Sequence, residues 1–318
     1  MNPNEKKRDA LFKKYADNLQ LLVKNKLLKA KGLDKYVYIC PVCLQLFEQV
    51  NQPTNPLTLE DAPPKSLGGK ANILTCKNCN NVAGTEIDVH LSERLNELDE
   101  RQLLPGTELK VKINIDGQSY AATLTVEHDG KMKIFHSKKN NNPVKLEKAM
   151  EQVTAGTVVD MDYLKSRVIP ERIEYALLKT AYLLAFQYFG YSLMLDTCYD
   201  DVRKQIRHPE QQTYPSGFWF QPTYPKEMAG CYFITDTSLE SLFIFFNVKT
   251  AQTERMFAVI LPLPVRPVAA VIRQLAQRFE KEKEFELTLY PNTPADYLTK
   301  IENIKAMHQW IDARKPKP

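Results

Sequence analysis

The chain has 318 residues, of which 43% are hydrophobic and 25% are charged, and its formal net charge is +5. This balance is that of a globular protein and argues against a largely disordered chain. The longest apolar run, at 176–186, is too short to cross a bilayer, and the N-terminus has no apolar signal region. We therefore expect a cytoplasmic protein with no membrane partner.

Segment 1–34 is predicted to be a basic amphipathic helix. Its apolar residues recur at helical spacing along 5–30, with lysines at many of the remaining positions, until Gly32 ends the pattern. Residues 1–31 contain nine Lys or Arg residues and three acidic residues. Such a cluster gains affinity for a polyanion by releasing counterions, and it suits a solvated helix face equally well. Both interpretations stay open.

Four of the six cysteines form two Cys-x-x-Cys pairs, Cys40 with Cys43 and Cys76 with Cys79. In a cytoplasmic chain such pairs favour a metal over disulfides. Four thiolates complete a tetrahedral shell around Zn²⁺ and leave no open position for catalysis. We therefore predict a structural zinc that stabilises a module within 35–105.

The segment between the pairs includes "LTLEDAPPKSLGG", and the second pair continues as "CKNCNNVAG" and then "IDVHL". This pattern, over 36–92, resembles the four-cysteine, zinc-knuckle branch of the HNH endonucleases. The resemblance implies a treble-clef, ββα-metal module in which a hairpin and a helix hold one catalytic Mg²⁺ or Mn²⁺, separate from the zinc. It also implies hydrolysis of nucleic-acid phosphodiester bonds, with DNA as the expected substrate, in bacterial restriction or antiviral defence.

The family pattern assigns roles to single positions of this chain. Its acidic ligand of the catalytic ion corresponds to Glu60, and its last ligand, directly after the final cysteine, corresponds to Asn80. Its histidine, which deprotonates water, is replaced by Asp61, and the asparagine that orients this base corresponds to Asn72. Oxygen donors at positions 60 and 80 suit Mg²⁺ or Mn²⁺.

Aspartate at position 61 is the main departure from the family. Histidine suits the role because its ordinary pKa of about 6.5 lies near neutrality. The ordinary pKa of aspartate is about 3.9, so Asp61 is a weak base unless burial or Glu60 raises that pKa. Asp61 can instead serve as a second ligand of the ion. The alternative function is a catalytically degenerate zinc protein that binds or senses nucleic acid, and a third is a structural protein that docks a partner.

Basic side chains near the motif are candidate contacts to the nucleic-acid backbone, namely Lys65, Lys70, Lys77 and His90. A solvated position suits each lysine almost as well. At 1.5 Å per residue, His90 lies about 15 Å along a helix from Asn80, too far to share its ion.

Two further regions follow the module. In 106–165 the hydrophobic period changes to two, with turns at Asp116-Gly117 and Asp129-Gly130, which predicts a small antiparallel meander and a helix at 144–152. We expect 166–318 to be α+β and to serve targeting, regulation or dimerisation, through a homo-oligomer or a regulatory partner. Its predicted helices lie near 170–190, 200–207, 267–280 and 294–312, and its strands near 230–236, 241–249 and 255–262. The predicted fold class of the whole chain is α+β.

Overall fold

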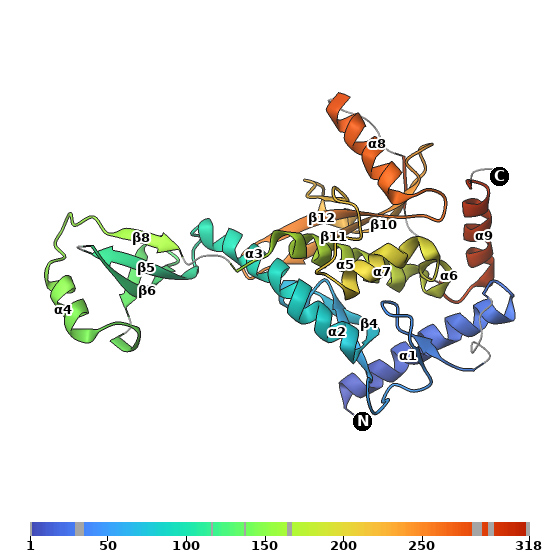
Figure 1. Ribbon diagram of the computed structural model, residues 1–318, viewed down its shortest axis with the longest axis horizontal. Coiled ribbons are helices and arrows are strands. Elements are labelled where there is room, and N and C mark those ends of the chain that lie inside the picture. The colour runs from blue at the N-terminus through green and yellow to red at the C-terminus, as the bar shows by residue number, and fades with distance from the viewer. Residues whose placement is uncertain are drawn as a thin grey trace. The chain divides into compact units, whose positions relative to one another are not determined.

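The computed structural model describes residues 2–28, 35–115, 117–136, 138–163, 167–281, 288–291 and 296–315. It has a mixed α+β structure with small antiparallel sheets (Figure 1). The chain divides into two compact units. The first comprises 1–92, 169–250 and 254–318, and the second comprises 93–168 and 251–253. None of the helices within the described ranges combines the length and the apolar character that a membrane span requires.

Helix α1 (Pro3–Lys24) opens the first unit. Asn2 caps it, because the Asn2 side chain accepts a hydrogen bond from the Glu5 backbone N–H at 2.9 Å while Glu5 accepts one from the Asn2 N–H at 2.8 Å. The predicted apolar stripe is buried, as Tyr15 and Leu19 show. The helix ends earlier than predicted, before Asn25, and the predicted stop at Gly32 lies outside the described residues, as do Lys29 and Lys31.

The cysteine-rich segment folds as short strands and one long helical stretch. Its elements are β1 (Tyr38–Ile39), β2 (Leu46–Phe47), β3 (Leu57–Ala62), η1 (Lys65–Leu67), β4 (Lys70–Cys76), α2 (Lys77–Ala83), η2 (Gly84–Asp88) and α3 (Val89–Arg101). Strands β1 and β2 pair, and β3 and β4 form a separate antiparallel hairpin. Gly69 closes the hairpin loop where a Cβ atom would lie 1.5 Å from the carbonyl oxygen of Pro63, so only glycine fits there.

The remainder of the first unit is built around one buried helix. Its elements are α5 (Pro170–Phe189), α6 (Tyr191–Met194), η4 (Thr197–Tyr199), α7 (Asp200–Arg207), β9 (Trp219–Phe220), η5 (Lys226–Met228), β10 (Gly230–Ile234), β11 (Ser241–Lys249), β12 (Glu254–Leu261), α8 (Val268–Lys281), β13 (Leu289–Pro291) and α9 (Ile301–Asp312). The strands form one antiparallel sheet in the order β13-β10-β11-β12-β9. Helix α5 contacts β11 and β12 of this sheet and also β3 and η2, so it joins the sheet to the hairpin.

These elements confirm the strands and helices predicted for 170–290. Helix α9 begins later than predicted, at Ile301. The backbone before it forms a turn in which the Asp296 carbonyl accepts hydrogen bonds from the Thr299 and Lys300 N–H groups. Part of the predicted start, 292–295, lies outside the described residues.

The second unit contains the end of α3 and the predicted meander. Its elements are β5 (Glu108–Ile115), β6 (Gln118–Val126), β7 (Met132–His136), η3 (Lys138–Asn140), α4 (Pro143–Glu151) and β8 (Asp160–Tyr163). The sheet order is β7-β6-β5-β8, and alternate residues of β5 and β6 are buried against α4. The turn at Gly130 has a φ of 83°, as a glycine turn allows, and Asp116 of the other predicted turn lies outside the described residues.

Candidate metal centre and acidic site

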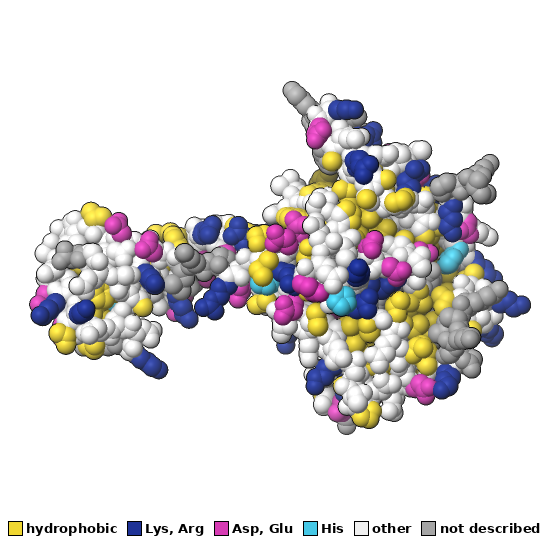
Figure 2. All heavy atoms as spheres, viewed as in Figure 1, with side chains coloured by type: hydrophobic (Ala, Val, Ile, Leu, Met, Phe, Trp, Pro, Cys, Tyr) yellow, Lys and Arg dark blue, Asp and Glu magenta, His cyan; other side chains and the backbone are white. Residues whose placement is uncertain are grey.

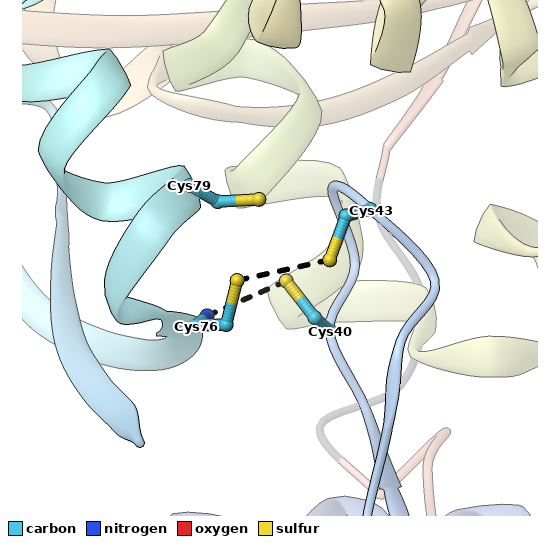
Figure 3. A group of neighbouring side chains, drawn as sticks. All are labelled: Cys40, Cys43, Cys76 and Cys79. Atoms are coloured by element: carbon cyan, nitrogen blue, oxygen red, sulfur yellow. Dashed lines mark hydrogen bonds between the residues drawn. The ribbon is translucent and has the colours of Figure 1, made fainter. Parts of the chain in front are cut away.

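The four paired cysteines meet at one point. Their sulfur atoms all lie within 4.8 Å of one another, and Figure 3 shows the four side chains converging from a loop and from the start of α2. Among the described residues this is the one group of three or more His, Cys, Asp or Glu side chains at metal-binding separation. Four soft donors at these separations fit a tetrahedral Zn²⁺.

Local backbone structure aims each thiol at this point. The Leu44 N–H donates to the Cys40 carbonyl at 2.9 Å, and the Leu44 φ of 61° turns the chain back so that the Gln45 carbonyl accepts from the Cys40 N–H at 2.9 Å. Cys76 ends β4 and precedes the first residue of α2, so Cys79 lies in the first turn of that helix. The Cys76 N–H donates to the Cys40 sulfur at 3.4 Å, the type of contact that stabilises a thiolate.

The thiols also change one another's acidity. Hydrogen bonding among them lowers the pKa of Cys43 to about 7 and also lowers the pKa of Cys76. The same network raises the pKa values of Cys40 and Cys79. Because Zn²⁺ binds thiolates, its binding would release the protons that the four thiols hold.

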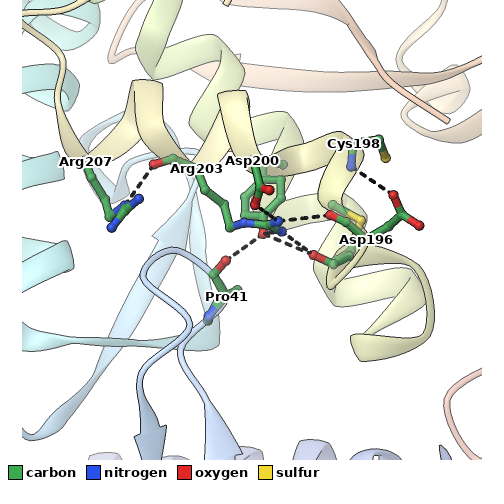
Figure 4. Close-up of polar contacts among 8 residues, drawn as sticks. Pro41, Asp196, Cys198, Asp200, Arg203 and Arg207 are labelled. Atoms are coloured by element: carbon green, nitrogen blue, oxygen red, sulfur yellow. Dashed lines mark hydrogen bonds and ion pairs between the residues drawn. The ribbon is translucent and has the colours of Figure 1, made fainter. Parts of the chain in front are cut away.

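The C-terminal helices hold the first cysteine loop in place. The Tyr182 hydroxyl of α5 donates to the Pro41 carbonyl at 2.6 Å. The Tyr191 hydroxyl donates to the Ile39 carbonyl at 2.8 Å and accepts from the Ile39 N–H at 2.8 Å. Arg203 of α7 lies beside Tyr182 and donates to the Asp200 carboxylate (Figure 4). The loop is thus part of the core of the first unit.

A β-bulge shapes the hairpin at the predicted site. Glu60 pairs with Ile73 but Asp61 pairs with Ala71, so Asn72 is the extra residue on β4. Such a bulge changes the local twist and redirects the side chains around it. None of the hydrogen bonds among the described residues involves the Asn72 side chain, so its predicted role in orienting a base remains a prediction.

Glu60 belongs to a buried ion-pair triad. The Lys179 ammonium of α5 lies 2.5 Å from Glu60 Oε1 and 2.5 Å from Asp88 Oδ2, and the Thr75 hydroxyl donates to Glu60 Oε2 at 2.8 Å. The side chains of Lys179, Glu60 and Asp88 are 1%, 5% and 14% exposed. Each oxygen of Glu60 thus has a partner, and a divalent ion at Oε1 would meet the ammonium. In this arrangement a cation at Glu60 would compete with the ammonium, and the role of Glu60 as a ligand stays a prediction.

Opposing effects set the charges of the triad. Burial raises the pKa of Glu60 and the pKa of Asp88, and the charge of Lys179 acts against both shifts. Burial alone would lower the pKa of Lys179, but the two carboxylates outweigh it and raise that pKa. Lys179 is therefore an ammonium at neutral pH. Among the described residues nothing donates a hydrogen bond to the buried Asp88 Oδ1, so the triad contains one unsatisfied acceptor.

Asp61 is the acid of the predicted site that keeps a free carboxylate. It is half-buried, and within the described part of the chain no side chain or backbone group hydrogen-bonds to it. Burial raises the pKa of Asp61, and the charges of Lys65, Lys179 and Lys7 act in the opposite direction. These cations come from η1, α5 and α1, so the basic helix α1 places a lysine near this carboxylate.

Asn80 ties the helix to the hairpin. Its Nδ2 donates to the Leu59 carbonyl at 2.8 Å and to the Thr58 hydroxyl at 3.1 Å. Among the described residues nothing donates to Asn80 Oδ1. This oxygen stays available, so the prediction of Asn80 as a ligand of a hard cation stands untested.

The four predicted contacts to nucleic acid differ in their exposure to solvent. Lys65, Lys70 and Lys77 are exposed. His90 is half-buried, and its Nδ1 accepts a hydrogen bond from the Ile169 backbone N–H at 3.3 Å, beside the start of α5. A structural contact thus uses one of its two ring nitrogens.

Sequence reasoning did not identify Lys179. The signal was present, because this lysine interrupts the apolar run "ALLKTAYLLAF" that was predicted to be a core helix. A lysine in a buried helix needs an anionic partner. Its partners, Glu60 and Asp88, are far away in the sequence, and helical periodicity gives no information on them.

Comparison of the chain with models of known protein families, with curated proteins and with solved structures finds no match.

Proposed function

We propose that this chain is a nucleic-acid phosphodiester hydrolase of the HNH type, acting on DNA, with a structural zinc bound by its four clustered cysteines. The hairpin β3–β4, the helix α2 that follows it and the adjacent thiol cluster are the parts that a treble-clef, ββα-metal module requires. The residue pattern that resembles the family lies on these elements.

The surroundings of Asp61 carry this proposal. Its carboxylate is unpaired, lies beside the bulge of the hairpin and has a raised pKa, as a proton acceptor requires. In the proposed reaction Asp61 accepts a proton from water as the water oxygen bonds to phosphorus. The bond from phosphorus to the departing sugar oxygen breaks, and that oxygen takes up a proton from solvent. Lys65 and Lys7, both exposed, would contact the phosphate and offset its charge.

The family's divalent ion, Mg²⁺ or Mn²⁺, would supply positive charge next to the scissile phosphate. Of its predicted ligands, Glu60 is engaged by Lys179, whereas among the described residues nothing donates to Asn80 Oδ1 or to the carboxylate of Asp61, the alternative ligand. This engagement favours a second candidate function, in which the chain binds nucleic acid without cutting it. Figure 2 shows Lys and Arg side chains interspersed with Asp and Glu on the face drawn, so such binding would depend on local clusters such as α1.

Plasmid nicking separates the two candidates. Purified zinc-loaded protein is incubated with supercoiled plasmid and Mg²⁺ or Mn²⁺, in parallel with Asp61→Asn, Asp61→His and the control Asp9→Asn, which changes an exposed acid of α1. Asp61→Asn removes the proposed base and should lower the nicking rate by on the order of 100-fold or more. Histidine, with its pKa near 6.5, should restore or raise the rate at neutral pH.

Nicking that is equal in wild type and Asp61→Asn would refute the proposed role of Asp61. Salt-sensitive retention of DNA without nicking by wild type or Asp61→His would favour the binding function. If the wild type neither nicks nor retains DNA, both candidates are refuted.

A further inference from the structure

We propose that Lys179 is an internal counter-ion that takes the place of a divalent cation at Glu60, so that a cation can bind at this carboxylate only when the ammonium is displaced. This inference deepens the proposed function, on which it rests for its link to hydrolysis. The contacts of Lys179 support the counter-ion role independently of any reaction.

Both oxygens of Glu60 already have a partner. The ammonium contacts Glu60 Oε1 and Asp88 Oδ2 at 2.5 Å each, and the Thr75 hydroxyl occupies Glu60 Oε2. A hard cation such as Mn²⁺ binds carboxylate oxygens at similarly short distances. The ammonium and the ion would therefore compete for the same oxygen atom.

Electrostatics make the competition strong. All three side chains of the triad are withdrawn from water, and charges interact more strongly where water is excluded. A divalent ion placed beside the ammonium would be repelled by it. Without the ammonium, the two carboxylates would be buried and unpaired, which is unfavourable unless another cation neutralises them.

The scaffold keeps the ammonium in position. Lys179 lies in the middle of α5, and its neighbours Leu178 and Thr180 are fully buried. Helix α5 contacts β3, which provides Glu60, and η2, which provides Asp88. The lysine is thus supplied from outside the hairpin and helix that resemble the family, and it can control metal occupancy of the site.

Direct metal binding tests the role. Zinc-loaded protein is titrated with Mn²⁺, and free Mn²⁺ is followed by electron paramagnetic resonance. The variants are Lys179→Met, Lys179→Arg, the double variant Glu60→Gln/Lys179→Met, and the control Lys204→Met, an exposed lysine of α7. Lys179→Met should bind one Mn²⁺ at least tenfold more tightly than wild type. The double variant should lose this gain, whereas Lys179→Arg and Lys204→Met should bind as wild type does.

Lys179→Met would not bind Mn²⁺ more tightly than wild type if Lys179 were only a packing residue. Unchanged or weaker Mn²⁺ binding by folded Lys179→Met would overturn the proposal, as would a gain that persists in the double variant. If Lys179→Met is unfolded without Mn²⁺, the proposal requires Mn²⁺ to restore its native circular dichroism spectrum, and failure to do so overturns it.

Nicking assays on the same proteins separate this inference from the proposed function. Tighter Mn²⁺ binding by Lys179→Met without nicking by any variant would leave the counter-ion role standing and refute hydrolysis. Nicking by wild type with no gain of binding in Lys179→Met would leave hydrolysis standing and refute the counter-ion role.

Discussion

At the scale of single residues, the cysteines and the charged groups differ in how far the sequence predicts them. The cysteine pairs predict their own meeting point, because each Cys-x-x-Cys forms a local turn and a single zinc ion can join two such turns. The engagement of Glu60 could not be predicted in this way. It depends on Lys179, 119 positions further along the chain, and no local pattern encodes that contact.

The hairpin loop gives a prediction for one glycine. Because a Cβ at Gly69 would overlap the Pro63 carbonyl, which belongs to the backbone, the substitution Gly69→Ala should destabilise the first unit by about 3 kcal/mol. Gly84 is the matched control, since it has a helical φ of −64° and no atom within 4 Å of its Cβ position. Gly84→Ala should stabilise the protein by about 0.5–1 kcal/mol. Urea unfolding measures both, and equal effects would contradict the expectation.

The pair formed by Glu240 and Arg266 predicts a pH dependence of stability. Burial raises the pKa of Glu240, but the hydrogen bond from Arg266 Nε at 2.5 Å and the Arg266 charge outweigh it, so the pKa in the folded state is lowered. The pair therefore stabilises the fold fully above the unfolded-state pKa of about 4.3 and loses this effect as pH falls through the lower folded-state value.

Urea unfolding between pH 3 and pH 7, compared between wild type and Glu240→Gln, measures this contribution. The difference in unfolding free energy should be constant above about pH 5 and shrink below it. Glu227→Gln, at an exposed position, is the control and should give a difference that stays near zero. A difference for Glu240→Gln that grows as pH falls would contradict the expected sign.

At the scale of elements, hydrophobic period predicted the helices and strands well. Helix α7 and strands β5 and β6 occur where the period indicates them, because each buries one continuous face. Helix α5 follows an apolar run and is buried on all sides through its middle. The bulge at Asn72 was not predicted. A bulge places two residues of one strand opposite one residue of its partner, and the residue types in the sequence do not reveal this. The attachment of the cysteine loop to α5 and α6 was also missed, since tyrosines in an apolar helix indicate burial but not the partner of their hydroxyls.

The Tyr191 hydroxyl therefore gives a prediction about the cysteine loop. Tyr191→Phe removes both hydrogen bonds to Ile39 and leaves a buried N–H without a partner, which should cost about 2 kcal/mol. It should also speed the transfer of zinc to a coloured chelator. Tyr224→Phe, at a residue 52% exposed, is the control and should change neither quantity. Unchanged zinc transfer by Tyr191→Phe would show that the loop is held without this contact.

At the scale of the whole molecule, the two units have separate cores. The apolar cluster of the second unit is formed by side chains of β5, β6 and α4, and the cysteine cluster belongs to the first unit. Metal binding stabilises the part of a protein whose folded state holds the ligands together.

Calorimetry should consequently show two unfolding transitions. Removing zinc with a chelator should lower the transition of the first unit by on the order of 10 °C and leave that of the second unit in place. The change Leu124→Ala, in the core of the second unit, should lower the unfolding temperature of the second unit and leave the chelator-sensitive transition of the first unit unchanged. A chelator that shifts both transitions equally would contradict the separation.

The hydroxyl groups that secure the first cysteine loop have a consequence for biosynthesis. Tyr182 and Tyr191 are 141 and 152 residues downstream of the backbone groups that they contact. At ribosomal rates of about 5–20 residues per second, they are translated roughly 7–30 s after that loop. All four thiols leave the ribosome earlier, so a nascent chain could bind zinc before these anchors exist, and the later helices would then assemble on a loop that is already closed.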